Sequence, residues 1–216
     1  MLRSYQHRTK PMRTIIIAFL MTFATQAAAE LQISFSSIIS DAQVATGNNK
    51  FTGKLKGYGV QVETQLFENY SLGVEYNDGI GELNPAASKF TFYEAIVYGI
   101  HKKAYYNLSF NKWILGSQIG LGFSDKASNF KNINYRQTQF PILLGLNVTS
   151  RSGVSVGISG YGQLDNLKNN RVGTLYFSYP LSGRLNLVGR YTSHKSKLRS
   201  FQHCGSDYSI GFSYDF

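Results

Sequence analysis

The chain is poor in cysteine and proline, with Cys204 as its only cysteine and 4 prolines among 216 residues. A single cysteine excludes a disulfide within the chain, and no group of Cys and His residues has the spacing of a metal site. The glycines lie inside strand-like segments and form no phosphate-binding loop. We therefore expect no metal and no other cofactor.

Long apolar runs are also missing beyond residue 29, where none approaches the roughly 20 residues of a membrane-spanning helix. The first segment differs, because it contains four basic residues, the apolar run Ile15–Met21 and three small residues that end at Ala29. This order of features predicts a signal peptide over residues 1–29 that is removed on export. Residues 30–216 would then form one domain.

Two methionines compete as the start of this signal peptide. Met12 opens a compact signal of its own, so translation begins either there or at Met1. Removal of the segment takes away four basic and no acidic residues, which lowers the net charge from +10 to +6. Because the protein is exported, we expect no nucleic-acid partner.

The C-terminal segment shows the clearest pattern in the chain. Large apolar or aromatic residues occupy every second position, and small or polar residues lie between them. Side chains alternate between the two faces of a strand, so this segment has one apolar face. The pattern predicts a lipid-facing strand. Its apolar positions are Tyr208, Ile210, Phe212, Tyr214 and Phe216.

Similar alternation runs through the rest of the mature chain. It predicts an all-β fold, a closed antiparallel up-and-down transmembrane β-barrel of about ten strands, with about eight as the alternative count. The candidate strands are Leu31–Ser40, Lys54–Phe67, Ser71–Gly81, Lys89–Lys103, Trp113–Ser124, Tyr135–Val148, Val154–Leu164, Arg171–Tyr179, Leu185–Lys195 and Asp207–Phe216.

The breaks between these strands alternate in length. Tight breaks such as Phe67–Tyr70 and Ser150–Gly153 are typical of periplasmic turns. The long polar stretches Asp41–Gly53, Asp125–Asn134 and Ser196–Ser206 are expected to be external loops.

Charged residues occur on the face opposite the apolar one. Glu63, Glu75 and Arg190 occupy such positions. Both faces of the segment around Glu94 carry apolar residues, and we place Glu94 in the lumen because a charge that faces lipid is costly. Because buried charges persist when they are paired, we expect these four side chains to form a polar network that fills the lumen. A narrow polar pore is the alternative.

The chain resembles the small outer-membrane barrels grouped as the OmpA-like or OmpX-like porin family. The resemblance rests on the alanines that end at Ala29, the strand-turn-strand pattern Gly57–Tyr76 and the terminal segment Tyr208–Phe216. It implies residence in the outer membrane of a Gram-negative bacterium, among its lipids and lipopolysaccharide. It also implies that the barrel-assembly machinery recognises the terminal segment, with Phe216 as the key residue. Members are structural barrels, adhesins or narrow pores, so we expect no enzymatic activity.

Basic residues in the predicted external loops and at the adjoining strand edges are candidates for anion binding. Lys195, Lys197 and Arg199 lie close together in sequence. They could bind lipopolysaccharide phosphates or an acidic glycan on a host surface.

One pattern suggests catalysis as an alternative function. His194 and Ser196 are separated by one residue, and Asp207 opens the next strand. This arrangement is similar to that of outer-membrane lipid A deacylases, where Ser attacks an ester, His takes its proton and an acid orients His.

Overall fold

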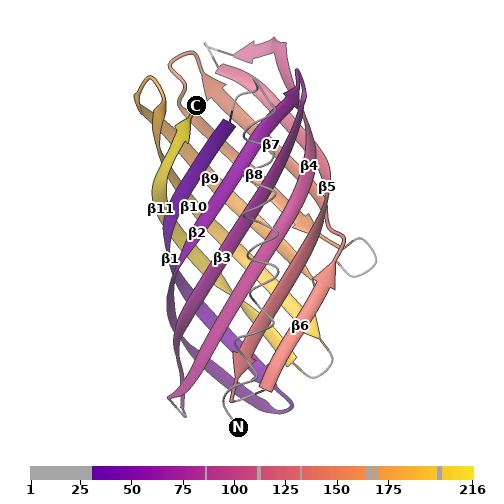
Figure 1. The fold of residues 1–216 in the computed structure, drawn as a ribbon, viewed down its shortest axis with the longest axis vertical. Helices are drawn as coiled ribbons and strands as arrows, with labels where there is room; N and C mark the ends of the chain where they lie inside the picture. Colours follow the sequence, from indigo (N-terminus) through magenta and orange to yellow (C-terminus); the bar gives the residue numbers. More distant parts are fainter. Residues whose placement is uncertain are drawn as a thin grey trace.

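A computed structural model gives the fold of the chain (Figure 1). It describes residues 31–85, 87–110, 113–131, 133–163, 167, 170–198 and 201–216. The predicted signal peptide lies outside these residues. Within them, no helix has the length and apolarity needed to cross a membrane.

The described residues form a single antiparallel sheet of strands that tilt around a common axis (Figure 1). The strands are β1 (Leu31–Thr46), β2 (Asn49–Phe67), β3 (Tyr70–Asn84), β4 (Ser88–Phe110), β5 (Trp113–Phe130), β6 (Ile133–Gln139), β7 (Ile142–Ser150), β8 (Ser155–Gly162), β9 (Arg171–Ser182), β10 (Leu185–Leu198) and β11 (Phe201–Asp215). Consecutive strands pair with each other except β6 and β7, which both pair with β5, and β1 also pairs with β11 along its length. The sheet is therefore a closed up-and-down barrel.

The eleven segments make a ten-stranded barrel, because β6 and β7 both pair with β5 and follow one another along it. The sequence predicts one strand here, and the interruption falls at Phe140 and Pro141. Proline has no amide hydrogen to donate to a ladder. The Pro141 carbonyl still accepts a hydrogen bond from the Gly122 amide at 3.0 Å. The expectation of a closed barrel of ten strands is confirmed, with one strand broken in two.

One section of the barrel has an apolar outer face. This belt consists of outward-facing side chains that remain exposed because they pack on no other part of the chain. Such a surface suits lipid rather than water. Its most exposed members include Phe35, Ile39, Tyr58, Leu121, Leu144, Ile158, Leu175, Tyr208, Ile210 and Phe212.

The prediction of long external loops is wrong, because strands occupy most of these residues. β1 and β2 continue beyond the belt and meet at a tight turn that contains Gly47, whose φ is 57°. β5 likewise continues to Phe130 and β10 to Leu198, and each meets its partner strand across a short connection. We call this end of the barrel, opposite Leu31 and the C-terminus, the far end (Figure 1).

The strands extend at the far end because their apolar residues there occupy the inward-facing positions instead of the outward-facing ones. Within the belt, β1 directs Phe35 and Ile39 outward and Ser34 inward. Beyond the belt, it directs Asp41 outward and buries Val44 inside. The inner side chains form a compact core, which we call the apolar cap: Ala42, Val44, Phe51, Leu55, Leu83, Phe90, Phe130 and Phe201.

Aromatic contacts pack the apolar cap tightly. The ring centroids of Phe51 and Phe130 are 4.8 Å apart in an edge-to-face arrangement, and Phe201 stacks on Tyr135 at 3.6 Å. Burying each ring stabilises the fold by about 2 to 3 kcal/mol. The cap thus fills the lumen at the far end and supports the extended strands.

Closure of the barrel requires a glycine at position 211. A Cβ built there would lie 1.8 Å from the carbonyl oxygen of Phe35 on β1. We predict that Gly211→Ala sharply lowers the yield of folded barrel, measured as the compact band on unheated denaturing gels. Gly173→Ala is the matched control, because its Cβ would meet no atom within 4 Å. Equal yields of both variants would contradict this role.

Candidate functional site

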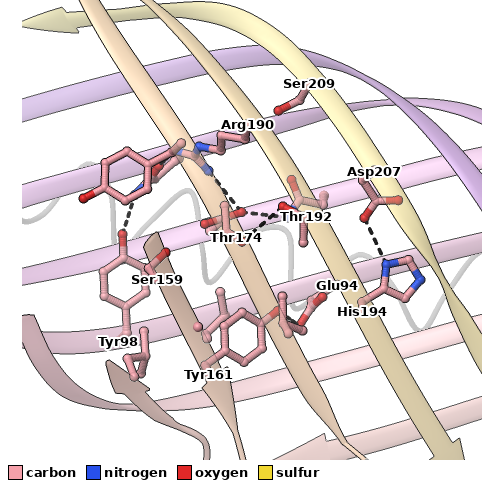
Figure 2. A pocket seen from close by; sticks show the side chains of 18 of the residues that line it. Glu94, Tyr98, Ser159, Tyr161, Thr174, Arg190, Thr192, His194, Asp207 and Ser209 are labelled. Atoms are coloured by element: carbon pink, nitrogen blue, oxygen red, sulfur yellow. Dashed lines mark hydrogen bonds and ion pairs between the residues drawn. The ribbon is translucent and has the colours of Figure 1, made fainter. Parts of the chain in front are cut away.

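A cavity of about 420 Å³ lies in the lumen below the apolar cap. It extends from Gln32 and Ser213, near the end that holds the C-terminus, to Phe201 of the cap and Phe92, which packs against the cap. Charged and phenolic side chains from several strands point into it (Figure 2). The lumen is therefore polar at mid-height and apolar at the far end.

Glu63 anchors the first cluster of this lumen. It forms an ion pair with Lys102 of β4. The Tyr98 hydroxyl also donates to Glu63 at 3.3 Å and accepts a hydrogen bond from the Gln61 amide at 2.7 Å. The cluster ties β2 to β4 across the lumen side of β3.

Arg190 of β10 reaches across the barrel to β2 and β3 (Figure 2). Its guanidinium pairs with Glu75 at 3.4 Å and donates to the side-chain oxygen of Gln61. Asn77 donates to the same Glu75 oxygen at 2.9 Å. Arg190 therefore links opposite walls of the barrel through charge-assisted hydrogen bonds.

Glu94 forms the third cluster, between β4, β5 and β8. It pairs with Lys126 at 2.9 Å, and both side chains are 16% exposed. The Tyr161 hydroxyl also donates to Glu94, and the Lys126 ammonium lies 5.0 Å from the Tyr161 ring centroid. This carboxylate is thus satisfied by a cation and a phenol.

The structure places all four predicted network residues in the lumen, but it distributes their partners differently. Only Glu75 contacts Arg190, whereas Glu63 and Glu94 pair with lysines that sequence reasoning missed. Lys102 lies an even number of residues from Glu94 on β4 and therefore faces the same side, so the alternation along this strand could have identified it. Lys126 was expected in an external loop, and it faces the lumen because β5 continues past Ser124.

Two histidines meet at the boundary between the polar lumen and the apolar cap. His194 Nδ1 lies 3.1 Å from Asp207 Oδ2 (Figure 2). His194 Nε2 lies 3.3 Å from His203 Nε2. His203 is buried, with the rings of Phe90 and Phe92 at 5.0 and 5.8 Å. A pair of facing nitrogens at this distance shares one hydrogen.

The geometry does not join Ser196 to this pair. The Ser196 hydroxyl donates to Gln137 at 3.0 Å, while the nitrogen of His194 that would act as a base faces His203. All three candidate catalytic residues, His194, Ser196 and Asp207, line the lumen cavity. Among the described side chains, no group of three or more His, Cys, Asp or Glu residues could hold a metal ion.

The remaining candidate residues lie on the outer face or outside the described chain. Lys195 and Lys197 belong to β10 beyond the belt, and Arg199 is outside the described residues. The side chains of the predicted assembly signal are exposed: Tyr208, Ile210, Phe212 and Tyr214 on the outer face of β11, and Phe216, which follows β11 and is 62% exposed. The Phe216 amide donates to the Leu31 carbonyl at 2.8 Å.

Comparison with known proteins gives a likeness in fold. No protein-family model matches the chain, and no curated protein sequence matches it. Solved structures that match include Neisserial surface protein A, with a TM-score of 0.46, 12% identity, and coverage of 85% of this chain and 97% of that one. Ail of Yersinia pestis matches with a TM-score of 0.38 and 10% identity, and the match covers 86% of this chain and 98% of Ail. OprG of Pseudomonas aeruginosa matches with a TM-score of 0.41 and 8% identity, and the match covers 88% of this chain and 96% of OprG. These proteins are small outer-membrane β-barrels, the class that the sequence resembles.

The buried histidine makes stability depend on pH. His203 lies beyond the belt, and burial lowers its pKa well below the usual range of about 6.5, with further lowering by His194 and Lys126. Between that lowered pKa and about 6.5, the unfolded chain binds a proton that the folded chain does not. The free energy of unfolding is therefore fully retained above pH 6.5 and falls as the pH drops below that value.

We predict that the free energy of unfolding falls by up to about 1.4 kcal/mol per pH unit below pH 6.5, from this residue alone. His203→Phe should remove that slope, measured by urea unfolding in detergent micelles at pH 7 and pH 5. His101→Gln is the control, since His101 lies at the opposite end of the barrel beside Tyr70. An unchanged slope in His203→Phe would contradict the assignment.

Proposed function

We propose that this protein is a non-enzymatic outer-membrane barrel with a closed lumen, and that its far end is a rigid surface for binding anionic partners outside the cell. The observation that carries the proposal is the apolar cap, which fills the lumen where the strands extend past the belt. The same strands present polar and basic side chains on their outer face.

The orientation follows from the expected route of assembly. A cleaved signal peptide would deliver the chain to the periplasm, and the exposed terminal side chains of β11 suit recognition by the barrel-assembly machinery. Both Leu31 and Phe216 then stay at the periplasmic rim, joined by their backbone hydrogen bond. The far end faces outward, next to outer-leaflet lipid and lipopolysaccharide.

The lumen supports a structural role better than a conducting one. The four acids that line the cavity are all partnered: Glu63, Glu75 and Glu94 pair with lysine or arginine, and Asp207 contacts His194. Paired charges rigidify a barrel interior, and the cavity ends beneath the cap. Catalysis is disfavoured by the hydrogen bond that directs Ser196 to Gln137 instead of His194.

We expect the wild-type protein to show no stepwise conductance in planar bilayers. Phe90→Ala/Phe130→Ala should conduct, because it removes two cap rings that are 0% and 1% exposed. Phe123→Ala/Phe140→Ala removes a contacting ring pair from the lipid face and should stay silent. Steady conductance by the wild type would establish the pore instead.

Anion binding is predicted at the far rim, where exposed Lys50 and Lys197 project beyond the belt. We expect Lys50→Gln/Lys197→Gln to reduce retention of micelle-bound protein on dextran sulfate beads about tenfold at low salt. Arg151→Gln/Arg184→Gln removes the same charge from exposed turns at the periplasmic end and should have little effect. Equal losses in both variants would mean that net charge alone attracts the beads.

A further inference from the structure

A surface groove of about 820 Å³ crosses the outer face of β9, β10, β11, β1 and β2 just beyond the belt. Its position is defined by three successive rows of registered residues. The first row is the edge of the belt and comprises Ile39, Tyr208, Tyr191 and Leu175, which are directly opposite one another across β1, β11, β10 and β9. All four side chains are exposed.

The second row forms the floor of the groove and carries little side-chain bulk. Ser206 of β11 lies opposite Ser193 of β10, which lies opposite Gly173 of β9. Its two hydroxyls can donate hydrogen bonds to an anion. Asp41 of β1 extends the row and is registered directly opposite Lys54 of β2, so their charges offset each other.

The third row is basic on the β9 and β10 side. Lys195 and Arg171 are direct cross-strand partners, and neither forms an ion pair with any described residue. Like charges directly opposite each other destabilise a sheet. An anion held between them would remove that repulsion. Arg171 could then bind it through two parallel hydrogen bonds.

We propose that Arg171 and Lys195 bind a phosphate on the headgroup of an outer-leaflet glycolipid of the lipid A type. The belt row provides a surface for its acyl chains, the serine row provides hydroxyl donors, and the basic row neutralises the phosphate. This inference rests on the proposed residence in the outer membrane. It assigns the site to a phosphorylated lipid because Lys195 and Arg171 lie four residues along their strands from the exposed Tyr191 and Leu175, at the depth of a headgroup.

The test measures how much bisphosphorylated lipid A stays with the refolded full chain after gel filtration in detergent. We expect Arg171→Gln/Lys195→Gln to retain about tenfold less lipid than the wild type, and Arg171→Lys/Lys195→Arg to retain most of it. Lys56→Gln/Lys89→Gln is the matched control, because it removes the same charge from exposed positions outside the groove. Cys204, the only cysteine, lies opposite Lys195 and should react more slowly with a maleimide when lipid is bound.

Equal lipid retention by the groove variant and the control would overturn the proposal, and so would equal retention of dephosphorylated lipid A by the wild type. Displacement of lipid A by equimolar inorganic phosphate would overturn its assignment to a lipid. Failure of the wild type to assemble in any outer-membrane lipid would instead refute the proposed function. A folded wild-type barrel that retains no lipid A would refute this inference alone.

Discussion

The pairing of β1 with β11 is the interaction on which the rest of the structure depends. Backbone amides and carbonyls have no water to bind in lipid, so a sheet can cross a membrane only if no edge is left open. The register from Gln32 opposite Asp215 to Thr46 opposite Phe201 closes that edge along the full length of both strands. Closure separates an outer face from an inner one, and every side chain then takes one of the two environments.

Two opposite hydrophobic patterns run along these closed strands. In the belt, apolar side chains face lipid and polar ones face the lumen, where Arg190, Lys102 and Lys126 neutralise the acids. At the far end, polar side chains face outward and apolar ones form the cap. The far end therefore has the arrangement of a water-soluble domain, with its apolar side chains inside and its polar side chains outside. The histidine pair lies at the boundary between the two regions.

Much of the fold could be predicted from sequence because alternation is a local signal. The terminal strand and the lumen position of Glu63 and Glu75 follow from alternation along a strand. Glu94 lies among apolar residues of both faces, and only the cost of a lipid-facing charge places it in the lumen. The extent of the far end could not be predicted in this way, because Asp41–Gly53 is rich in polar residues and its apolar members alternate in the opposite phase. Contacts such as Glu94 with Lys126 also depend on the β4–β5 register, in which these two residues are direct partners. No local pattern encodes that register.

The central claim is that the strands continue beyond the membrane as a rigid end closed by the apolar cap. Amide hydrogen exchange of the barrel in lipid nanodiscs tests it most directly. Residues 42–46, 51–55, 126–130 and 201–206 should exchange slowly, like the belt, because their amides lie in ladders supported by the cap. Fast exchange in these segments, comparable to that of the turns, would contradict the claim and restore the long external loops.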